Sequence, residues 1–407
     1  MALMEKLLDL IQPGTTVFVP GSSGEPTAAL QALANAPERC DGVHFITTFV
    51  PGINTFDLAS LGTGANFTSF FMHPSLAAAQ TEGRLRLIDL PWSRLPEWLS
   101  LQKIDIALAQ VSAECRNGQH SLGPAVEFTP MVLAQASEKV AITNACTPWM
   151  DGSVALETSL FDLVIEGTHA LPGYPDPIIN DLYQKIGTQV AQLIPNSATI
   201  QVGLGQAPAA ALDALHNHRD IRLHSGIFFD CLLRLIDSGV MATDRPLVSG
   251  LAVGSRKFYG KLKNYPGIRM IEVGQTHNPE TIRKIDNFFT INSAIEVDLE
   301  GNVNAQVLGG KHISGQGGLP DFTTAGHESR GGASIIVLPS TNSKGNKSRI
   351  VRKVQHLTVP GANIDYVITE HGCAKLKGNN AAERICQLRN VSAPQFADIL
   401  SESEQYL

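Results

Sequence analysis

Short apolar runs alternate with amphipathic stretches along most of the chain. Strands are expected in the runs "TTVFVP", "GVHFITTFV", "RLRLIDLP", "IDIALAQVS", "KVAITNA" and "FDLVIEG", and later in "TIQVGLG", "SIIVLPS" and "IDYVITE". Helices are expected at the N-terminus ("MALMEKLLDLIQPG") and in "PTAALQALAN" and "APAAALDALHN". Continuous apolar strands that alternate with helices are typical of parallel sheets covered by helices. The pattern therefore predicts an α/β protein.

This rhythm restarts near the middle of the chain. The stretches "TVFVPGSSGEPTAALQAL" and "TIQVGLGQAPAAALDAL" both read as a strand, a glycine turn, a proline in the first helical turn and an Ala/Leu helix. Proline is tolerated there because the N–H group that it lacks would be unpaired anyway. The match predicts an internal duplication, with similar open α/β domains at residues 1–190 and 191–407 and a boundary inside "YQKIGTQVAQLIPNSA". A chance match between two ordinary strand–helix units would give the same pattern.

Composition narrows the classes of function. The chain has 407 residues, 43% of them hydrophobic and 17% charged, which indicates a globular protein with more than one core. A net charge of −7 without basic–aromatic runs argues against nucleic acid as a partner. No apolar run approaches the roughly 18 residues of a membrane span, and the acidic N-terminal helix does not resemble a secretory signal. We therefore expect a cytoplasmic protein without a membrane partner.

Metal and redox chemistry find little support in the sequence. The six cysteines are scattered and form no CxxC pair, so free thiols are expected, and the twelve histidines show no HExxH spacing. A G-x-S-x-G elbow is also absent from the sequence. The stretch "GLGQAP" departs from the dinucleotide fingerprint because Pro208 replaces its third glycine. We predict no bound metal and no nicotinamide cofactor.

The strongest local motif is "SGQGGLPDF", in a Gly- and Ser-rich region at residues 301–350 that is expected to form a long functional loop. Gly315, Gly317 and Gly318 would let the backbone lie flat against a ligand. Asp321 would anchor this loop through backbone hydrogen bonds, as aspartate does in turns. A flexible linker, the alternative, would not need such an anchor.

Weaker motifs each have a structural alternative. Gly203 and Gly205 are candidate oxyanion donors, although they also fit an ordinary strand–helix turn. Lys347 and Arg349 are candidate phosphate ligands, although such clusters are usually solvated. A further group consists of carboxylates at turns or strand ends, where α/β proteins place their sites; its members are Glu25, Glu166 and Glu370, the last beside His371.

Taken together, the motifs resemble one family. They are, in order, "GSSGEPTAALQAL", "AQVS" with "SLG", "GLGQAPAAAL", "LHSGIF" with "LIDSGV", "GSRKFY", "INSAIEVDLEGNVNA", "SGQGGLPDF", "LPST" with "SRIV", and "DYVITEHG". The series resembles the acetyl-CoA hydrolase/transferase family, which includes 4-hydroxybutyrate, butyryl-CoA and itaconate CoA-transferases. The resemblance implies two similar open α/β domains of the CoA-transferase type, with the active site between them.

The resemblance also implies a chemistry. In this family a glutamate carboxylate attacks an acyl-CoA thioester, the CoA thiolate then converts the resulting anhydride into a glutamyl-CoA thioester, and a second carboxylic acid collects the CoA. Carried over by position, Gly315, Gln316, Gly317 and Gly318 would line the CoA and acyl site, and Gly203 and Gly205 would supply oxyanion donors. Lys347 and Arg349 would lie near the CoA phosphates. Coenzyme A would be a substrate, not a bound cofactor.

The chain departs from the family at its nucleophile. Members typically read His-Thr/Ser-Glu-Met-Phe at this strand end, whereas the same positions here are His224, Ser225, Gly226, Ile227 and Phe228. A gapless alignment places Gly226 on the nucleophile, and the Glu-Asn/Ser-Gly register of other CoA-transferases places His224 there. Neither register leaves a carboxylate. The nearby Asp230 is expected to cap the following helix.

Several explanations remain open. Another carboxylate enters the site, with Glu25, Glu166, Glu272 and Glu370 as candidates. Alternatively, the acid substrate attacks the thioester directly, or His224 activates water and the protein is an acyl-CoA hydrolase. A partner subunit of a hetero-oligomer could bring the glutamate, or the chain binds acyl-CoA without catalysis.

From these alternatives we predict a CoA-transferase that acts on a small acyl-CoA and a carboxylic acid, as a homodimer or homotetramer. The apolar wall of the pocket is expected from Phe228, Phe258 and Tyr259, unless these side chains belong to the core.

Overall fold

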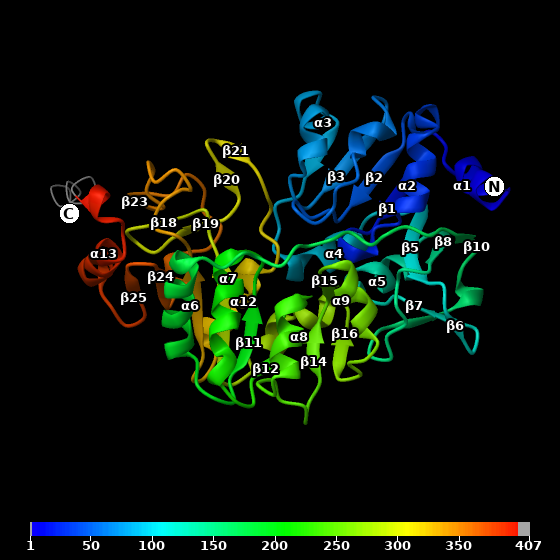
Figure 1. Ribbon diagram of the computed structural model, residues 1–407. Helices are drawn as coiled ribbons and strands as arrows, with labels where there is room; N and C mark the ends of the chain where they lie inside the picture. The colour runs from blue at the N-terminus through cyan, green and yellow to red at the C-terminus, as the bar shows by residue number, and fades with distance from the viewer. Residues whose placement is uncertain (1, 398–407) are drawn as a thin grey trace.

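The computed structural model describes residues 2–397 and contains two α/β units, each built around a mainly parallel sheet (Figure 1). The N-terminal unit lies at the upper right of Figure 1 and the C-terminal unit at the lower left, with their sheets side by side across a junction. The predicted α/β fold class is confirmed.

The first sheet has seven strands in the order β10-β8-β5-β1-β2-β3-β4, all parallel. Their bounds are β1 Thr16–Val19, β2 His44–Thr47, β3 Asn66–Ser69, β4 Leu85–Leu87, β5 Ile106–Ser112, β8 Glu138–Asn144 and β10 Leu163–Glu166. The helices of this unit are α1 Ala2–Leu10, α2 Thr27–Ala34, α3 Ala77–Thr81, α4 Leu95–Ser100 and α5 Thr129–Gln135. A small antiparallel sheet lies beside them, formed by β6 Cys115–Arg116, β7 Gln119–Ser121 and β9 Ala155–Glu157.

Alternating side chains of β1 explain why this sheet is covered on both faces. Val17 and Val19 pack into the core beneath α1 and α2, whereas Phe18 points to the opposite face, towards Leu95 and Leu99 of α4. Successive residues of a strand point to opposite faces, so an apolar run without polar positions needs a cover on each side. The expected terminal helix and the strand "TTVFVP" are confirmed.

The second sheet repeats the strand order of the first. Its six strands are ordered β12-β11-β17-β22-β24-β25, and an isolated parallel bridge between His224 and Val248 continues it from β12 to the parallel pair β14–β16. The order β24-β22-β17-β11-β12-β14-β16 thus matches β10-β8-β5-β1-β2-β3-β4, with the duplicated stretches on β1–α2 and β11–α7. Shared topology of this kind supports the duplication read from the sequence.

The elements of the C-terminal unit have the following bounds. Its sheet strands are β11 Thr199–Val202, β12 Arg222–Leu223, β14 Leu247–Ser249, β16 Ile268–Met270, β17 Phe288–Ser293, β22 Ala333–Val337, β24 Tyr366–Thr369 and the antiparallel β25 Gly372–Lys375. Its helices are α6 Asp181–Leu193, α7 Gln206–Asp213, α8 Asp230–Asp237, α9 Arg256–Leu262, α10 Val273–Thr276, α11 Pro279–Ile282, α12 Leu319–Glu328 and α13 Ala381–Asn390. A short parallel pair joins β13 Ile227–Phe229 to β15 Leu251–Val253 near the junction.

The connection between the units runs from β10 to α6 (Figure 1). The boundary predicted near residue 190 lies inside α6, whose Gly187 allows close approach to α7, because a Cβ atom there would lie 2.3 Å from the carbonyl oxygen of Ala210. The exact boundary stays a prediction.

The Gly-rich region at residues 301–350 is more ordered than one long loop. It contains β19 Val303–Asn304, a hairpin of β20 Val307–Leu308 and β21 Lys311–His312, the helix α12, β22, and the start of β23 Ile350–Val351. β19 and β23 flank β18 Glu296–Asp298 in a small sheet. The strand predicted in "SIIVLPS" is confirmed as β22, whereas the prediction of a long loop before it is wrong, because short strands and α12 interrupt that region. The segment around residues 314–318 is a loop of the expected kind.

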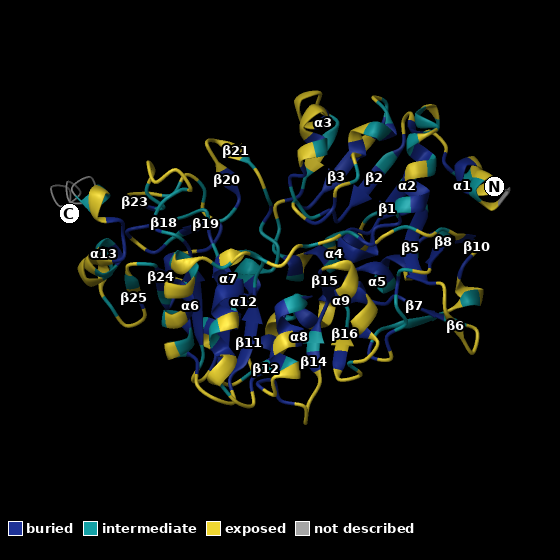
Figure 2. Ribbon diagram, in the orientation of Figure 1, coloured by how far each residue is buried: buried dark blue, intermediate teal, exposed yellow. Residues whose placement is uncertain are grey.

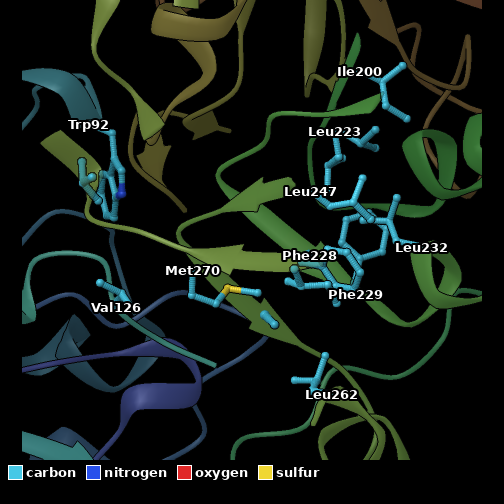
Figure 3. Close-up of a cluster of buried hydrophobic side chains, with 14 of the residues drawn as sticks. Trp92, Val126, Ile200, Leu223, Phe228, Phe229, Leu232, Leu247, Leu262 and Met270 are labelled. Atoms are coloured by element: carbon cyan, nitrogen blue, oxygen red, sulfur yellow. The ribbon is translucent and has the colours of Figure 1, made fainter. Parts of the chain in front are cut away.

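One apolar core runs through the junction between the units. Figure 3 shows Trp92 and Val126 of the N-terminal unit in the same cluster as Phe228, Leu232 and Met270 of the C-terminal unit. The central strands of both sheets are buried, while the outer faces of α6 and α13 are exposed (Figure 2). No helix among residues 2–397 is long and apolar enough to cross a bilayer. The shared core fixes how the two sheets face one another.

Candidate active site

A cavity of about 250 Å³ lies at the junction between the two units. Both units contribute to its apolar lining, the N-terminal unit with residues that include Ile53, Phe71 and Trp92 and the C-terminal unit with residues that include Leu251 and Phe322. The C-terminal unit contributes the ends of β11 and β17 and the loop at residues 314–318, which we call the glycine loop. The predicted placement of a site between the domains agrees with this cavity.

The glycine loop approaches the N-terminal unit too closely for side chains. A Cβ atom on Gly315 would lie 2.0 Å from the carbonyl oxygen of Phe70, and Gly317 has a φ of +57°, in the left-handed region that favours glycine. The carbonyl oxygen of Gly317 accepts a hydrogen bond from the N–H group of Trp92 at 2.9 Å. Glycine is therefore required here for contact between the units as well as for access to a ligand.

Two carboxylates anchor the glycine loop. Asp321, in the first turn of α12, accepts hydrogen bonds from the Ser93 N–H group at 3.0 Å and from the Ser93 hydroxyl at 2.5 Å. Burial raises the pKa of Asp321 to about 6, although the Ser93 hydrogen bonds oppose this shift. Asp89 accepts a hydrogen bond from Gln316 Nε2 at 2.9 Å. The predicted anchoring role of Asp321 is thus seen in the structure, with a side chain of the other unit as the partner.

The N–H groups of Gly315, Gln316, Gly317 and Gly318 make no hydrogen bond with any part of the chain that the structure describes. All four residues line the cavity. Unpaired backbone donors around a cavity form a site for a carbonyl oxygen that gains negative charge. This arrangement is what an acyl-transfer oxyanion requires.

The other expected oxyanion donors are placed differently. The Gly203 N–H group already donates to the carbonyl oxygen of Ile291 at 2.8 Å, so it is not free to bind a substrate. Gly203 still lines the cavity, whereas Gly205 lies outside the lining and precedes α7 with a φ of +128°. Gly203 and Gly205 thus form the tight strand–helix turn that the sequence analysis gave as the alternative to an oxyanion role.

Gly226 lines the cavity, and His277 occupies the space beside it. A Cβ atom on Gly226 would lie 3.0 Å from both Cε1 and Nε2 of His277, and 3.5 Å from Phe322. A Cβ atom on Gly318 would lie even closer, 2.5 Å from His277 Nε2. The imidazole is therefore wedged between two glycines, where a side chain at position 226 would otherwise begin.

The surroundings of His277 hold it in one orientation. Its Nδ1 atom is 2.8 Å from the Thr276 hydroxyl, and its ring packs on Phe322 with ring centroids 4.7 Å apart. The side chain is 4% exposed, and burial, assisted by the nearby His224, lowers the pKa of His277 to about 3. The imidazole is therefore neutral at physiological pH and gives no positive charge to the site.

Glu127 is the carboxylate that lines the cavity. Within residues 2–397 its carboxyl group makes no hydrogen bond or ion pair, although the residue is only 7% exposed. Burial raises the pKa of Glu127 to about 8. The residue also has a φ of +40°, which is costly for a side chain other than glycine. A strained, buried and unpartnered acid is typical of a functional site.

The candidate acids of the sequence analysis lie away from the cavity. Glu25 is buried and accepts hydrogen bonds from Asn54 Nδ2 at 2.8 Å and from the Thr27 hydroxyl at 2.9 Å. Glu370 accepts hydrogen bonds from the N–H group and the hydroxyl of Ser340, at 2.8 and 2.6 Å. Neither residue lines the cavity, and the partners of each carboxyl give it a structural role.

The remaining candidates are also outside the lining. Glu166 is exposed at the end of the edge strand β10, and Glu272 precedes α10 and is half-buried. His224 points away from the cavity, because its Nε2 atom bonds to the carbonyl oxygen of Thr276 at 2.8 Å. The Lys347 side chain is exposed on a turn.

Arg349 lies closer to the site than Lys347 does, and its Nη1 atom is 3.5 Å from the carbonyl oxygen of Ala294, which follows the cavity residue Ser293. The proposed apolar wall belongs instead to the core. Phe228 is fully buried against Phe258, with ring centroids 6.2 Å apart, and the Tyr259 hydroxyl donates to the carbonyl oxygen of Pro172 at 2.6 Å.

Asp230 does not cap its own helix. The side chain accepts from the N–H group of Ser255, which precedes α9, at 2.9 Å, so it ties α8 to α9. Among residues 2–397, no cluster of His, Cys, Asp and Glu has the arrangement of a metal site.

Sequence reasoning missed Glu127 and His277, the two titratable side chains among the residues that line the cavity. Glu127 follows the motif "SLG" by a few residues, and His277 lies in "GQTHNP", a stretch without a recognised pattern. The one available signal was an acidic residue directly after the apolar stretch "GPAV".

Comparison with known proteins agrees with this geometry. Models of the acetyl-CoA hydrolase/transferase N-terminal and C-terminal domains match residues 1–169 and 254–404. The chain is 29% identical to 4-hydroxybutyrate coenzyme A transferase from Clostridium kluyveri, over 97% of this chain and 95% of that protein. It is 30% identical to succinyl-CoA:cyclohexane-1-carboxylate CoA transferase from Geobacter metallireducens, over 97% and 92% of the two chains.

A solved structure is similar along almost the whole chain. The crystal structure of RipA from Yersinia pestis superposes with a TM-score of 0.92 at 25% identity, over 99% of this chain and 96% of that one. The resemblance inferred from the motifs is therefore confirmed. The chain belongs to the acetyl-CoA hydrolase/transferase family.

Proposed function

We propose that the protein transfers coenzyme A between a small acyl-CoA and a carboxylic acid. The observation that carries this proposal is the row of unpaired N–H groups at residues 315–318, which faces a cavity containing one buried carboxyl group. Such donors stabilise the tetrahedral oxyanion that forms when a nucleophile attacks a thioester carbonyl. Both named relatives are CoA-transferases, which agrees with this reaction.

The size of the cavity favours a small acyl group. A volume of about 250 Å³, walled by Ile53, Phe71 and Trp92, fits a short acyl chain together with the end of the pantetheine arm. Burying the apolar acyl chain would contribute about 0.8 kcal/mol for each methylene group. Because the cavity is small, we expect the protein to prefer acyl groups of two to four carbon atoms, from acetyl to butyryl, over longer acyl chains.

The CoA phosphates would lie outside the cavity. Arg349 contacts the carbonyl oxygen of Ala294, next to the cavity residue Ser293, and Lys347 lies on the exposed turn before it. Arginine suits phosphate groups because its guanidinium presents paired donors. We therefore retain both as phosphate ligands, with Arg349 as the stronger expectation. Cytoplasmic location and assembly into a homodimer or homotetramer likewise remain expectations.

Acyl-CoA hydrolysis is the second candidate, and one observation favours it. His277 is a neutral imidazole at the cavity wall, and its Nε2 atom has no partner within the described part of the chain. Its free Nε2 atom can accept a hydrogen bond and a proton from an attacking water, although a pKa of about 3 makes His277 a weak base. His224, the base suggested by the sequence, points away from the cavity.

A steady-state assay separates these two functions. Purified protein is incubated with acetyl-CoA or butyryl-CoA, with and without a panel of carboxylic acids, and both new acyl-CoA and free CoA are measured. Transfer predicts new acyl-CoA that requires the acid and shows ping-pong kinetics. Release of free CoA at a rate independent of the acid would instead establish hydrolysis. Tight acyl-CoA binding with neither product would show a non-catalytic protein.

A further inference from the structure

The cavity that Gly226 lines also contains a buried acid, Glu127, from the other unit. We propose that Glu127 is the residue that carries the covalent CoA intermediate in this chain, and that His277 fills the space left at Gly226. This inference rests on the proposed CoA transfer and names the residue that performs it. No carboxylate at the candidate positions 25, 166, 272 or 370 lines the cavity, whereas that of Glu127 does.

Backbone contacts place Glu127 next to Gly226. The Gly250 N–H group donates to the carbonyl oxygen of Gly226 at 3.2 Å, and the Glu127 N–H group donates to the carbonyl oxygen of Gly250 at 3.4 Å. Glu127 and Gly226 therefore flank the same residue, one on each side of the junction. The Glu127 side chain therefore starts close to the place where the side chain of an acid at position 226 would start.

The structure holds Glu127 in place despite its strained backbone. Its carbonyl oxygen accepts a hydrogen bond from the Val273 N–H group at 3.0 Å, and it forms a parallel bridge with Glu272. Both contacts come from the segment that leads through α10 to His277. The two residues we pair, Glu127 and His277, are thus positioned by the same short helix.

The carboxyl group has the environment of a nucleophile and not of a structural acid. Glu25 and Glu370 each have two hydrogen-bond donors, whereas Glu127 has none within residues 2–397. A carboxylate without donors, once ionised in a dry cavity, is poorly stabilised and therefore reactive. The titratable groups on the facing segment are Glu272 and the neutral His277, and neither supplies a positive charge.

The reaction balances with this one residue. A Glu127 carboxylate oxygen attacks the thioester carbon, the C–S bond breaks, and CoA leaves as the thiolate, which gives a mixed anhydride. The thiolate then attacks the Glu127 carboxyl carbon, the bond from that carbon to the bridging oxygen breaks, and the first acid leaves with that oxygen. The second carboxylate reverses both steps and returns Glu127 as a carboxylate. The free N–H groups of the glycine loop face the oxyanion of each addition step.

Adduct mapping on the full chain tests the inference. Wild-type protein is incubated with acetyl-CoA or butyryl-CoA without an acid, the glutamyl thioester is trapped with borohydride or hydroxylamine, and peptides are mapped by mass spectrometry. We expect the modified residue to be Glu127. Glu127→Gln should lose the adduct and lower kcat for transfer by roughly 10³-fold or more, because a lost nucleophile usually costs at least this much.

Controls separate a chemical role from a structural one. Glu127→Gln keeps the shape of the side chain, so unchanged acyl-CoA binding and unfolding midpoint would show an intact site. Glu166→Gln, at an exposed carboxyl outside the cavity lining, is the matched control and should keep the adduct and the transfer rate. Ionisation of Glu127 is required for attack, so kcat/KM should rise with pH to a plateau, with an apparent pKa of about 8.

Each other outcome has a defined meaning. Transfer with an adduct on another residue, or undiminished transfer by Glu127→Gln, would overturn the role of Glu127 while leaving CoA transfer intact. Transfer with no adduct and sequential kinetics would also overturn it, in favour of direct attack by the acid. If no acyl-CoA gives either an adduct or an exchange product, the proposed function fails together with the inference.

Discussion

Replacing Gly226 by alanine tests whether His277 truly fills the space beside it. The added Cβ atom would lie 3.0 Å from two atoms of the His277 ring, where ordinary contacts begin at about 3.4 Å. The ring cannot easily retreat, because Thr276 holds Nδ1 at 2.8 Å and Gly318 closes the other side. Overpacking of this kind costs typically about 1–3 kcal/mol. We expect Gly226→Ala to lower the free energy of unfolding by this amount.

A double-mutant cycle isolates the contact from other effects. His277→Ala alone should destabilise the protein by roughly 2–5 kcal/mol, as the loss of a large buried side chain does. In the double variant the new methyl group enters the space that the imidazole has left. The double variant should therefore lose about 1–3 kcal/mol less stability than the two single variants lose together. Urea unfolding followed by tryptophan fluorescence measures all four proteins, with Trp92 at the cavity as a local probe.

A matched glycine provides the control. Gly274 lies in the same short helix as Thr276, and a Cβ atom there would meet nothing within 4 Å, so Gly274→Ala should be neutral or slightly stabilising. The reasoning is refuted if Gly226→Ala costs less than about 0.5 kcal/mol, or if the cycle is additive within about 0.5 kcal/mol. The same contact predicts that Gly226→Glu alone gains no activity, because the first atom of the new side chain would already lie 3.0 Å from the His277 ring.

Three further predictions follow from other parts of the site. Gly315→Ala should raise the KM for acyl-CoA at least tenfold in steady-state assays, because its Cβ atom would lie 2.0 Å from the carbonyl oxygen of Phe70 and displace the loop. Arg349→Ala should raise the KM for acyl-CoA but not for acyl-pantetheine, which lacks the nucleotide phosphates; equal effects on both would contradict a phosphate contact. For Glu127 the folded pKa of about 8 exceeds the ordinary value of 4.5, so the folded state keeps a proton that the unfolded state loses. Stability relative to Glu127→Gln should therefore fall as the pH rises from 5 to 8, by on the order of 3 kcal/mol in chemical unfolding, and a flat difference would refute this pKa.

Most strands could be predicted from the sequence because buried parallel strands are continuous apolar runs. β1, β5, β11 and β22 are of this kind. The strands that the prediction missed include β3 and β17, whose sequences "NFTS" and "FFTINS" carry polar residues that pair inside the protein. Asn292 of β17, for example, exchanges two hydrogen bonds with Gln201, at 3.0 and 2.8 Å. Such paired side-chain hydrogen bonds depend on which strands are neighbours in the sheet, so they cannot be predicted from the sequence of one segment.

The candidate site was predicted in its backbone parts and missed in its side chains. Glycine clusters such as residues 315–318 are visible in a sequence because few other constraints demand them. Glu127 and His277 are single residues in unrelated segments, and only the packing of α10 against the turn at Gly250 brings them to one cavity. The candidate acids were chosen mainly because they lie at strand ends, whereas Glu127, the acid that lines the cavity, follows a turn in the N-terminal unit.

The two units contribute different parts of the cavity, so substitutions in them should affect substrate binding and kcat differently. The proposed nucleophile Glu127 belongs to the N-terminal unit, as do Ile53, Phe71 and Trp92 of the apolar lining, whereas the unpaired N–H groups belong to the C-terminal glycine loop. Contacts with the acyl chain exist before and after attack and therefore act on binding, while contacts with the oxyanion exist only during the addition steps and act on kcat. The two kinds of contact are joined by the hydrogen bonds of Ser93 to Asp321 at 3.0 and 2.5 Å. An acid at position 127 instead of 226 thus places the nucleophile and the oxyanion donors on different units, and makes the reaction depend on how closely the two units approach each other at the cavity.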